Sequence, residues 1–173
     1  VINMATSSNL TVTSTGNFNI TSTGNTAITV SPGTLTEANV INYKFTGGNY
    51  ALTLTANSNV RSLDFTGFSG TLGNSSLGIF GNLILSSNMT RTAGTGTYTF
   101  RSTSTQYITT NGVTLDCPIT INGVGGNVIL QDAVTIGSTR LTTLTNGTLD
   151  LNGLTWSTGT FNTGTGTKNI TFN

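Results

Sequence analysis

Apolar and small polar residues alternate along much of this chain, and the alternation is already clear in its first forty residues. The segments 9–15 and 17–23 are near copies of one another, and both alternate apolar residues with Thr, Asn or Ser. A period of two places apolar side chains on one face of a β-strand and polar side chains on the other. Ser31–Pro32–Gly33 then predicts a break in the chain. We therefore predict a strand-rich N-terminal arm or cap over residues 1–38, with the first strands of the main body as the alternative for this segment.

Residues 39–173 carry a longer series of short apolar runs, which we interpret as the strands of a β-solenoid body. Gly, Asn or Ser separates most neighbouring runs, and Asn-Gly pairs stand at 111–112, 122–123, 146–147 and 152–153. Asn and Gly tolerate the positive φ of tight turns, so each pair predicts a turn. The strand candidates are residues 43–45, 50–54, 60–65, 77–85, 98–100, 108, 113–115, 119–121, 128–130, 134–136, 141–144, 149–156 and 170–172.

Two short internal repeats favour a solenoid. Lys-Phe-Thr-Gly at 44–47 returns twenty residues later as Asp-Phe-Thr-Gly at 64–67, and Thr-Leu-Asp occurs at both 114–116 and 148–150. Short strands that recur every ~15–20 residues are typical of stacked coils, whose parallel strands lie about 4.8 Å apart. The predicted fold is all-β, a right-handed parallel β-helix (β-solenoid) with a less regular N-terminal β segment. A β-sandwich built from hairpins is the alternative, because Asn-Gly is also a hairpin signal.

The alternation predicts a side-chain register near the end of the chain. Leu149 and Leu151 are expected to point into one apolar core while Asp150 points out. The run 168–173 alternates in the same way. Terminal coils of a solenoid expose unpaired strand edges, so we expect this end and Val1–Ile2 to be covered by another copy or by the rest of a longer chain.

The composition supports an all-β chain. The sequence contains 39 Thr, 22 Gly, 21 Asn and 16 Ser, which together exceed half of its 173 residues. Because these residue types weaken helices, we predict less than ~5% α-helix. A disordered chain is a poor alternative, since Leu, Ile, Val and Phe number 45 and the net charge is only +1.

The most distinctive stretch reads Thr-Asn-Gly-Thr-Leu-Asp-Leu-Asn-Gly at 145–153, followed in specificity by Ile-Asn-Gly-Val-Gly-Gly at 121–126 and Leu-Gln-Asp at 130–132. With these motifs, residues 108–156 resemble the Thr/Gly/Asn-rich β-helical repeats of bacteriophage virion proteins and bacterial surface adhesins. The similarity extends over residues 40–173 and fades before them. It implies a parallel β-helix with a structural or adhesive role, and no active site.

The residue types that perform acid–base catalysis or bind metals are scarce. The chain has no His and a single cysteine, and its acidic residues are scattered, at Glu37, Asp64, Asp116, Asp132 and Asp150. We therefore predict no catalytic, cofactor-binding or metal site and no enzymatic activity. A stacked ladder of Asp116, Asp132 and Asp150 would be the one exception, since they are 16 and 18 residues apart. The simpler interpretation is that each Asp caps the turn that follows a strand.

Three further features are open to a functional interpretation. Aromatic residues could stack on sugars but more often fill a core. Cys117 precedes a proline in an apolar stretch and is predicted to be a buried, unreactive thiol. Thr-x-Thr pairs could bind ice if they stacked at constant spacing, but their spacing is irregular. The aromatic candidates are Tyr43, Tyr50, Tyr98, Tyr107 and Trp156, and examples of the Thr pairs are 11/13, 21/23, 34/36, 53/55, 95/97, 103/105, 143/145, 158/160 and 165/167.

The expected function is that of a non-catalytic structural building block of an extracellular assembly. A phage virion component, such as a fibre or capsid decoration, is favoured over a bacterial adhesin or filament subunit, because a short module is easier to place in a virion than in a giant adhesin. A carbohydrate- or ice-binding solenoid is a further alternative, and a polysaccharide-degrading enzyme would need its acids to converge in one groove.

The expected partners are further copies or other subunits of the assembly, and surface glycans. Nucleic acid is not expected because no two basic residues are adjacent, and no apolar run is long enough to span a membrane.

Overall fold

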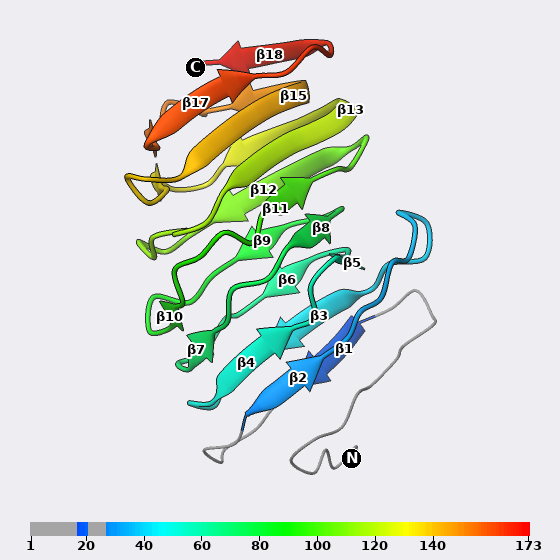
Figure 1. Ribbon diagram of the computed structural model, residues 1–173, viewed down its shortest axis with the longest axis vertical. Helices are drawn as coiled ribbons and strands as arrows, with labels where there is room; N and C mark the ends of the chain where they lie inside the picture. Colours follow the sequence, from blue (N-terminus) through cyan, green and yellow to red (C-terminus); the bar gives the residue numbers. More distant parts are fainter. Residues whose placement is uncertain (1–16, 21–26) are drawn as a thin grey trace.

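Every strand pairing in the structure is parallel, and each joins segments about one coil apart in the sequence. The computed structural model describes residues 17–20 and 27–173, and in this part the chain forms eighteen β-strands and no helix. The strands stack as a β-solenoid of about seven turns, which rises from the N-terminal strands to the C-terminal ones (Figure 1). The predictions of an all-β solenoid and of almost no helix are confirmed. A sandwich built from hairpins is excluded, because hairpins require antiparallel pairs.

The strands of successive coils align in three rows. The first row comprises β5 (Ser58–Val60), β8 (Leu77–Ile79), β11 (Tyr98–Phe100), the first parts of β13 (Ile119–Leu130) and β15 (Leu141–Asp150), and β17 (Thr160–Thr163). The second row comprises β1 (Asn17–Ile20), β3 (Asn42–Phe45), β6 (Leu63–Asp64), β9 (Leu83–Ile84), β12 (Thr105–Thr109), the later parts of β13 and β15, and β18 (Lys168–Thr171). The third row comprises β2 (Ile28–Val30), β4 (Ala51–Leu54), β7 (Thr71–Leu72) and β10 (Thr90–Arg91). In later coils β14 (Val134–Thr135) and β16 (Trp156–Ser157) form a separate two-stranded sheet.

The core consists of apolar ladders in which one side chain of each coil lies on the next. In the second row, the register stacks five buried residues in one column, namely Tyr43, Leu63, Leu83, Ile108 and Leu130. The first sequence repeat, at 44–47 and 64–67, is spaced by one coil, because Lys44 pairs in register with Asp64. Beside them the rings of Phe45 and Phe65 stack with centroids 5.0 Å apart.

The second sequence repeat is not a coil. Leu115 forms a bridge with Ile136, whereas Leu149 pairs with Val128, so the two copies of Thr-Leu-Asp lie at different places in their coils. Their spacing of 34 residues is not a multiple of the coil, which advances by about twenty residues between paired strands. The two copies of Thr-Leu-Asp therefore do not mark equivalent positions of two coils. In a chain composed of so few residue types, a tripeptide recurs without structural meaning.

Two of the four predicted Asn-Gly turns are wrong. Asn111–Gly112 and Asn152–Gly153 do form turns in which both residues have positive φ. Asn122–Gly123 and Asn146–Gly147 instead lie within β13 and β15, where the strand bends from the first row to the second with a shift in register. The two asparagines stack there, and Asn146 Nδ2 donates a hydrogen bond to Asn122 Oδ1 over 2.7 Å.

Strand boundaries differ from prediction mainly at this same bend. The candidates 60–65 and 77–85 are each divided in two, because earlier coils turn sharply between the first and second rows. Strands β7, β10 and β17 were not predicted. They have only two to four residues each, and they contain Thr, Asn or Arg among very few apolar residues.

Both ends of the described chain pair with the body. Within the segment 1–38, β1 pairs with β3 and β2 pairs with β4, so these strands extend the second and third rows by one rung. At the other end, the predicted register is confirmed: Leu149 is buried, Leu151 packs against the core, and Asp150 faces outward to accept a hydrogen bond from the backbone of Asn152. Residues 1–16 and 21–26, which include Val1–Ile2, lie outside the described residues.

One charged side chain lies inside the solenoid. The three guanidinium nitrogens of Arg91 are buried without a hydrogen-bond partner, and its guanidinium carbon lies 4.7 Å from the ring centroid of Tyr98. This cation–π contact offsets part of the cost of removing the charge from water. Arg91 is therefore a weak point of the core rather than a support for it.

Gly123 allows the bent coils to approach closely, so its replacement with Ala should destabilise the protein. A Cβ at this position would overlap the carbonyl oxygen of Ser102 in the preceding coil. Because backbone must move, we expect Gly123→Ala to lower the free energy of unfolding by about 1–3 kcal/mol, measured by urea denaturation. Gly73→Ala is the control, since its Cβ would lie 3.2 Å from the nearest atom and should cost less. Equal stability of the two variants would contradict the packing described here.

Replacing Arg91 with Met should leave stability unchanged or increase it. The lost hydration of an unpaired buried guanidinium exceeds the cation–π energy, so we expect the free energy of unfolding to rise by zero to about 2 kcal/mol in urea denaturation. Arg101→Met, at an exposed position, is the control and should change stability by less than about 0.5 kcal/mol. A loss of more than about 2 kcal/mol on replacing Arg91 would show that the guanidinium stabilises the fold.

Candidate binding groove

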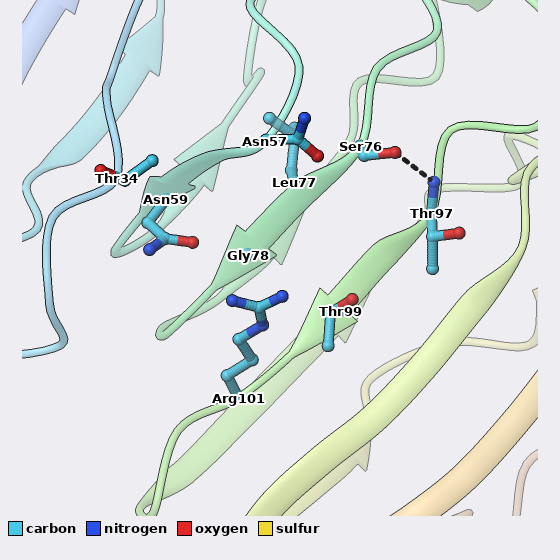
Figure 2. Close-up of a pocket in the computed structure, with 9 residues that line it drawn as sticks. All are labelled: Thr34, Asn57, Asn59, Ser76, Leu77, Gly78, Thr97, Thr99 and Arg101. Carbon is cyan, nitrogen blue, oxygen red and sulfur yellow. Dashed lines mark hydrogen bonds between the residues drawn. The ribbon is translucent and has the colours of Figure 1, made fainter.

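A polar groove crosses three coils on the first row of strands. It has a volume of about 380 Å³ and lies across β5, β8 and β11 (Figure 2). Hydroxyl and amide side chains predominate in its walls, with one guanidinium at its edge. The lining residues are Thr34, Asn57, Asn59, Ser76, Leu77, Gly78, Thr97, Thr99 and Arg101.

A glycine interrupts an outward-facing column of side chains in the groove. Strand pairing places Asn59, Gly78 and Thr99 directly over one another on successive coils. A Cβ on Gly78 would overlap the side-chain oxygen of Asn59. Gly78 is itself buried, and the side chains of Asn59 and Arg101 fill the space that a side chain at this position would take.

Hydrogen bonds fix the orientation of Asn59. Its Nδ2 donates to the carbonyl oxygen of Leu35 over 2.8 Å, and its backbone N–H donates to the carbonyl of Gly33 over 2.7 Å. With the nitrogen engaged, the side-chain oxygen faces the groove above Gly78, as Figure 2 shows. An acceptor held in this way can bind a ligand donor without first being ordered.

The segment from Gly33 to Val40 forms one wall of the groove through Thr34, and it is tied to two later coils. Arg61 donates from Nη2 to the carbonyl oxygen of Glu37 over 2.8 Å, and Ser102 Oγ donates to the Glu37 carboxylate. Ser102 is buried and lies 65 residues further along the chain. These contacts make the wall a fixed part of the solenoid.

Arg101 supplies the positive charge of the groove. It follows β11, and its side chain extends over Gly78 toward Asn59 (Figure 2). The side chain is exposed, and within the described part of the chain its guanidinium has no hydrogen-bond or ion-pair partner. By contrast, Lys44 pairs with Asp64 and Arg140 pairs with Asp116.

The acidic residues do not line this groove, and each is bonded elsewhere. Lys44 Nζ lies 2.8 Å from Asp64 Oδ2. Burial raises the pKa of Asp64, but hydrogen bonds from Lys44 and Thr66 and the Lys44 charge outweigh it, so this pKa lies below its ordinary value. Asp132 accepts hydrogen bonds from the backbone N–H groups of Thr110 and Asn111 in the preceding coil.

The three aspartates of the hypothetical ladder do not stack. Asp150 pairs with Ile129, Asp132 lies beyond the end of β13, and Asp116 adjoins a bridge in another part of the coil. Of these three, Asp150 caps its own turn as the simpler interpretation predicts, and Asp64, which was not part of the ladder, does the same. Asp116 instead forms an ion pair, over a glycine whose Cβ would overlap its carboxylate.

Most of the aromatic candidates belong to the core. Tyr43, Tyr50 and Tyr98 are buried, and burial raises the pKa of Tyr43 and Tyr50 to about 12. Trp156 is partly buried, and its indole N–H donates to Thr142 Oγ1 over 3.1 Å. Tyr107 alone among these five is exposed, and it does not line the groove.

The Thr-x-Thr pairs do not form a regular array. The pair 53/55 follows the third row, 143/145 lies on the first row, and 103/105 and 165/167 precede the second row at different registers. The pairs 11/13 and 21/23 lie outside the described residues. The stacked Thr surface that an ice-binding function would need is therefore not made by these pairs.

Cys117 is buried, as predicted. Burial raises the pKa of its thiol to about 11, so the reactive thiolate is scarce near neutral pH. In the described part of the chain, no three His, Cys, Asp or Glu side chains are close enough to hold a metal ion together.

The groove residues Asn59 and Arg101 were not singled out from the sequence. The sequence signal for the groove was the spacing of one column: Asn59, Gly78 and Thr99 are separated by 19 and 21 residues, close to one coil each. That spacing becomes informative only once the register of the coils is known.

Among the described residues, no helix is long and apolar enough to cross a membrane.

Comparison of the chain with protein-family models, with curated proteins and with solved structures finds no match.

Proposed function

We propose that this protein is a non-catalytic structural building block of an extracellular assembly. The supporting observation is the surface of its last described coil, where apolar side chains are exposed beside unpaired strands. Among the described residues, β17 and β18 pair only with β15, so their outer edges carry free backbone groups. Such edges are templates for a further strand.

The apolar surface at this edge is substantial. Phe172 is 74% exposed and Phe161 is 36% exposed. Together with Ile170 and Trp156 they line an apolar cavity of about 240 Å³. Ile170 and Phe172 thus share one side, as the alternation predicted. A further β coil, from another subunit or from a continuation of the chain, would pair with the strand edges and cover these side chains.

Within an assembly, the proposed role is that of a phage virion component, either a fibre or a capsid decoration. The compact solenoid of about seven turns fits a short repeated module, and the resemblance of residues 108–156 to phage and adhesin repeats points the same way. A bacterial adhesin or filament subunit is the second candidate. Parallel ladders with few charges suit both, because they form stiff rods whose strands are paired from coil to coil.

Self-association through the last coil is the testable consequence. We expect the protein to form oligomers at micromolar concentration, measured by light scattering and analytical ultracentrifugation. Replacing both Phe161 and Phe172 with Ser should weaken association at least about tenfold, because each removes apolar surface from the contact.

Tyr107→Ser is the matched control, since Tyr107 is 40% exposed but lies on β12, in the middle of the second row. This variant should associate like the original protein. A chain that stays monomeric at ~100 µM, or a double variant that associates unchanged, would overturn the proposed contact.

A further inference from the structure

We propose that the polar groove at Gly78 binds a monosaccharide unit carrying a carboxylate, with Arg101 holding the carboxylate and the neighbouring hydroxyl and amide groups holding the sugar hydroxyls. This site is independent of self-association, because it lies on β5, β8 and β11 rather than on the last coil. The inference rests on the unpaired cation, the polar walls and the fixed shape of the groove.

The cation favours an anion with a flat, forked shape. An arginine guanidinium presents parallel N–H donors that match a carboxylate, and a charge-assisted pair of this kind is about twice as strong as a neutral hydrogen bond. Arg101 is available for it, since it has no ionic partner in the described chain and no acid lines the groove. The nearest described acid along this wall, Glu37, is turned toward Ser102.

The walls favour a ligand rich in hydroxyl groups. Thr99 lies on β11 beside Arg101, and Thr97 lies just before the same strand (Figure 2). Within the described chain the hydroxyls of both threonines make no hydrogen bond. Ser76 Oγ accepts from the backbone N–H of Thr97 over 3.2 Å and keeps its own proton to donate. Asn59 adds an acceptor. Sugar hydroxyls both donate and accept, so they can satisfy each of these groups.

The size and charge of the groove disfavour other anions. Its volume of about 380 Å³ is near the lower limit of the ~300–1,000 Å³ typical of ligand sites, which suits one or two sugar rings. A nucleic acid would need a row of cations to neutralise its phosphates, whereas only Arg101 lines the groove. Inorganic phosphate would satisfy the arginine but leave the hydroxyls on the opposite wall unused.

The test is a saturation-transfer NMR titration of the full chain, which works whether or not the protein assembles. The probes are methyl glucuronide, the neutral methyl glucoside and inorganic phosphate as a competitor. We expect the glucuronide to bind with a Kd on the order of 1 mM and the glucoside at least about tenfold more weakly. Arg101→Gln should reduce glucuronide binding at least about tenfold.

Two variants separate binding from folding. Lys168→Gln removes one positive charge on β18, away from the groove, and should leave binding unchanged. Thr99→Val keeps the shape of an outward side chain and should weaken both sugars by a similar factor, because it removes a hydroxyl rather than a charge. Circular dichroism and melting temperature confirm that each variant is folded.

Several results would overturn the proposal. These are the absence of saturation transfer to the glucuronide, equal binding of glucuronide and glucoside, and unchanged binding by a folded Arg101→Gln variant. Displacement of the glucuronide by equimolar phosphate would also overturn it, because the groove would then be a simple anion site.

Discussion

The parallel backbone ladder between successive coils is the interaction on which the rest of this structure depends. The backbone N–H of Tyr43 donates a hydrogen bond to the backbone carbonyl of Ser62 on the next coil. The N–H of Leu63 donates in turn to the carbonyl of Asn82, and both bonds are 2.9 Å long. This ladder fixes which residue of one coil lies over which residue of the next. Because strands are only about 4.8 Å apart, like side chains must stack directly, and the core becomes a set of apolar columns.

The same ladder explains how the chain uses its few charged groups and some of its asparagines. Lys44 meets Asp64 because they occupy one column, and Asp132 reaches the backbone of Thr110 because it lies one coil away. Asn122 and Asn146 meet at the bend for the same reason. Each of these contacts joins neighbouring coils, so polar groups reinforce the stacking instead of forming a separate site.

The groove and the last described coil are two places where the regular stacking is locally incomplete. At Gly78 a column lacks one side chain, and the side chains of Asn59 and Arg101 fill its place and line the polar groove. At β17 and β18 the ladder itself has no further partner in the described chain, and Phe172 is left exposed. Local omissions in a regular structure thus account for both surfaces to which we assign a role.

The sequence alone determined the fold class. It also determined which neighbouring residues point to opposite faces of a strand. Thr, Asn and Gly exclude helices, and alternation such as Leu149–Asp150–Leu151 gives the buried and exposed sides, because both properties are local to the chain. The Lys44 and Asp64 repeat even predicted one coil correctly, since two copies of a motif stack when their spacing equals the coil.

Only the tertiary structure decided the register between coils. Coil length varies, so the paired positions shift by 25 residues from Tyr43 back to Phe18 but by 20 residues from Tyr43 to Leu63. A spacing in the sequence therefore cannot say which side chains meet. The hypothetical aspartate ladder and the coil inferred from the second repeat were wrong for this reason. Asn122–Gly123 bends within a strand instead of ending it in a turn, and Gly123 fits there because the carbonyl of Ser102 in the coil beneath leaves no room for a side chain. The groove at Gly78 could not be anticipated either, since it is made by three coils that meet only when the chain has folded.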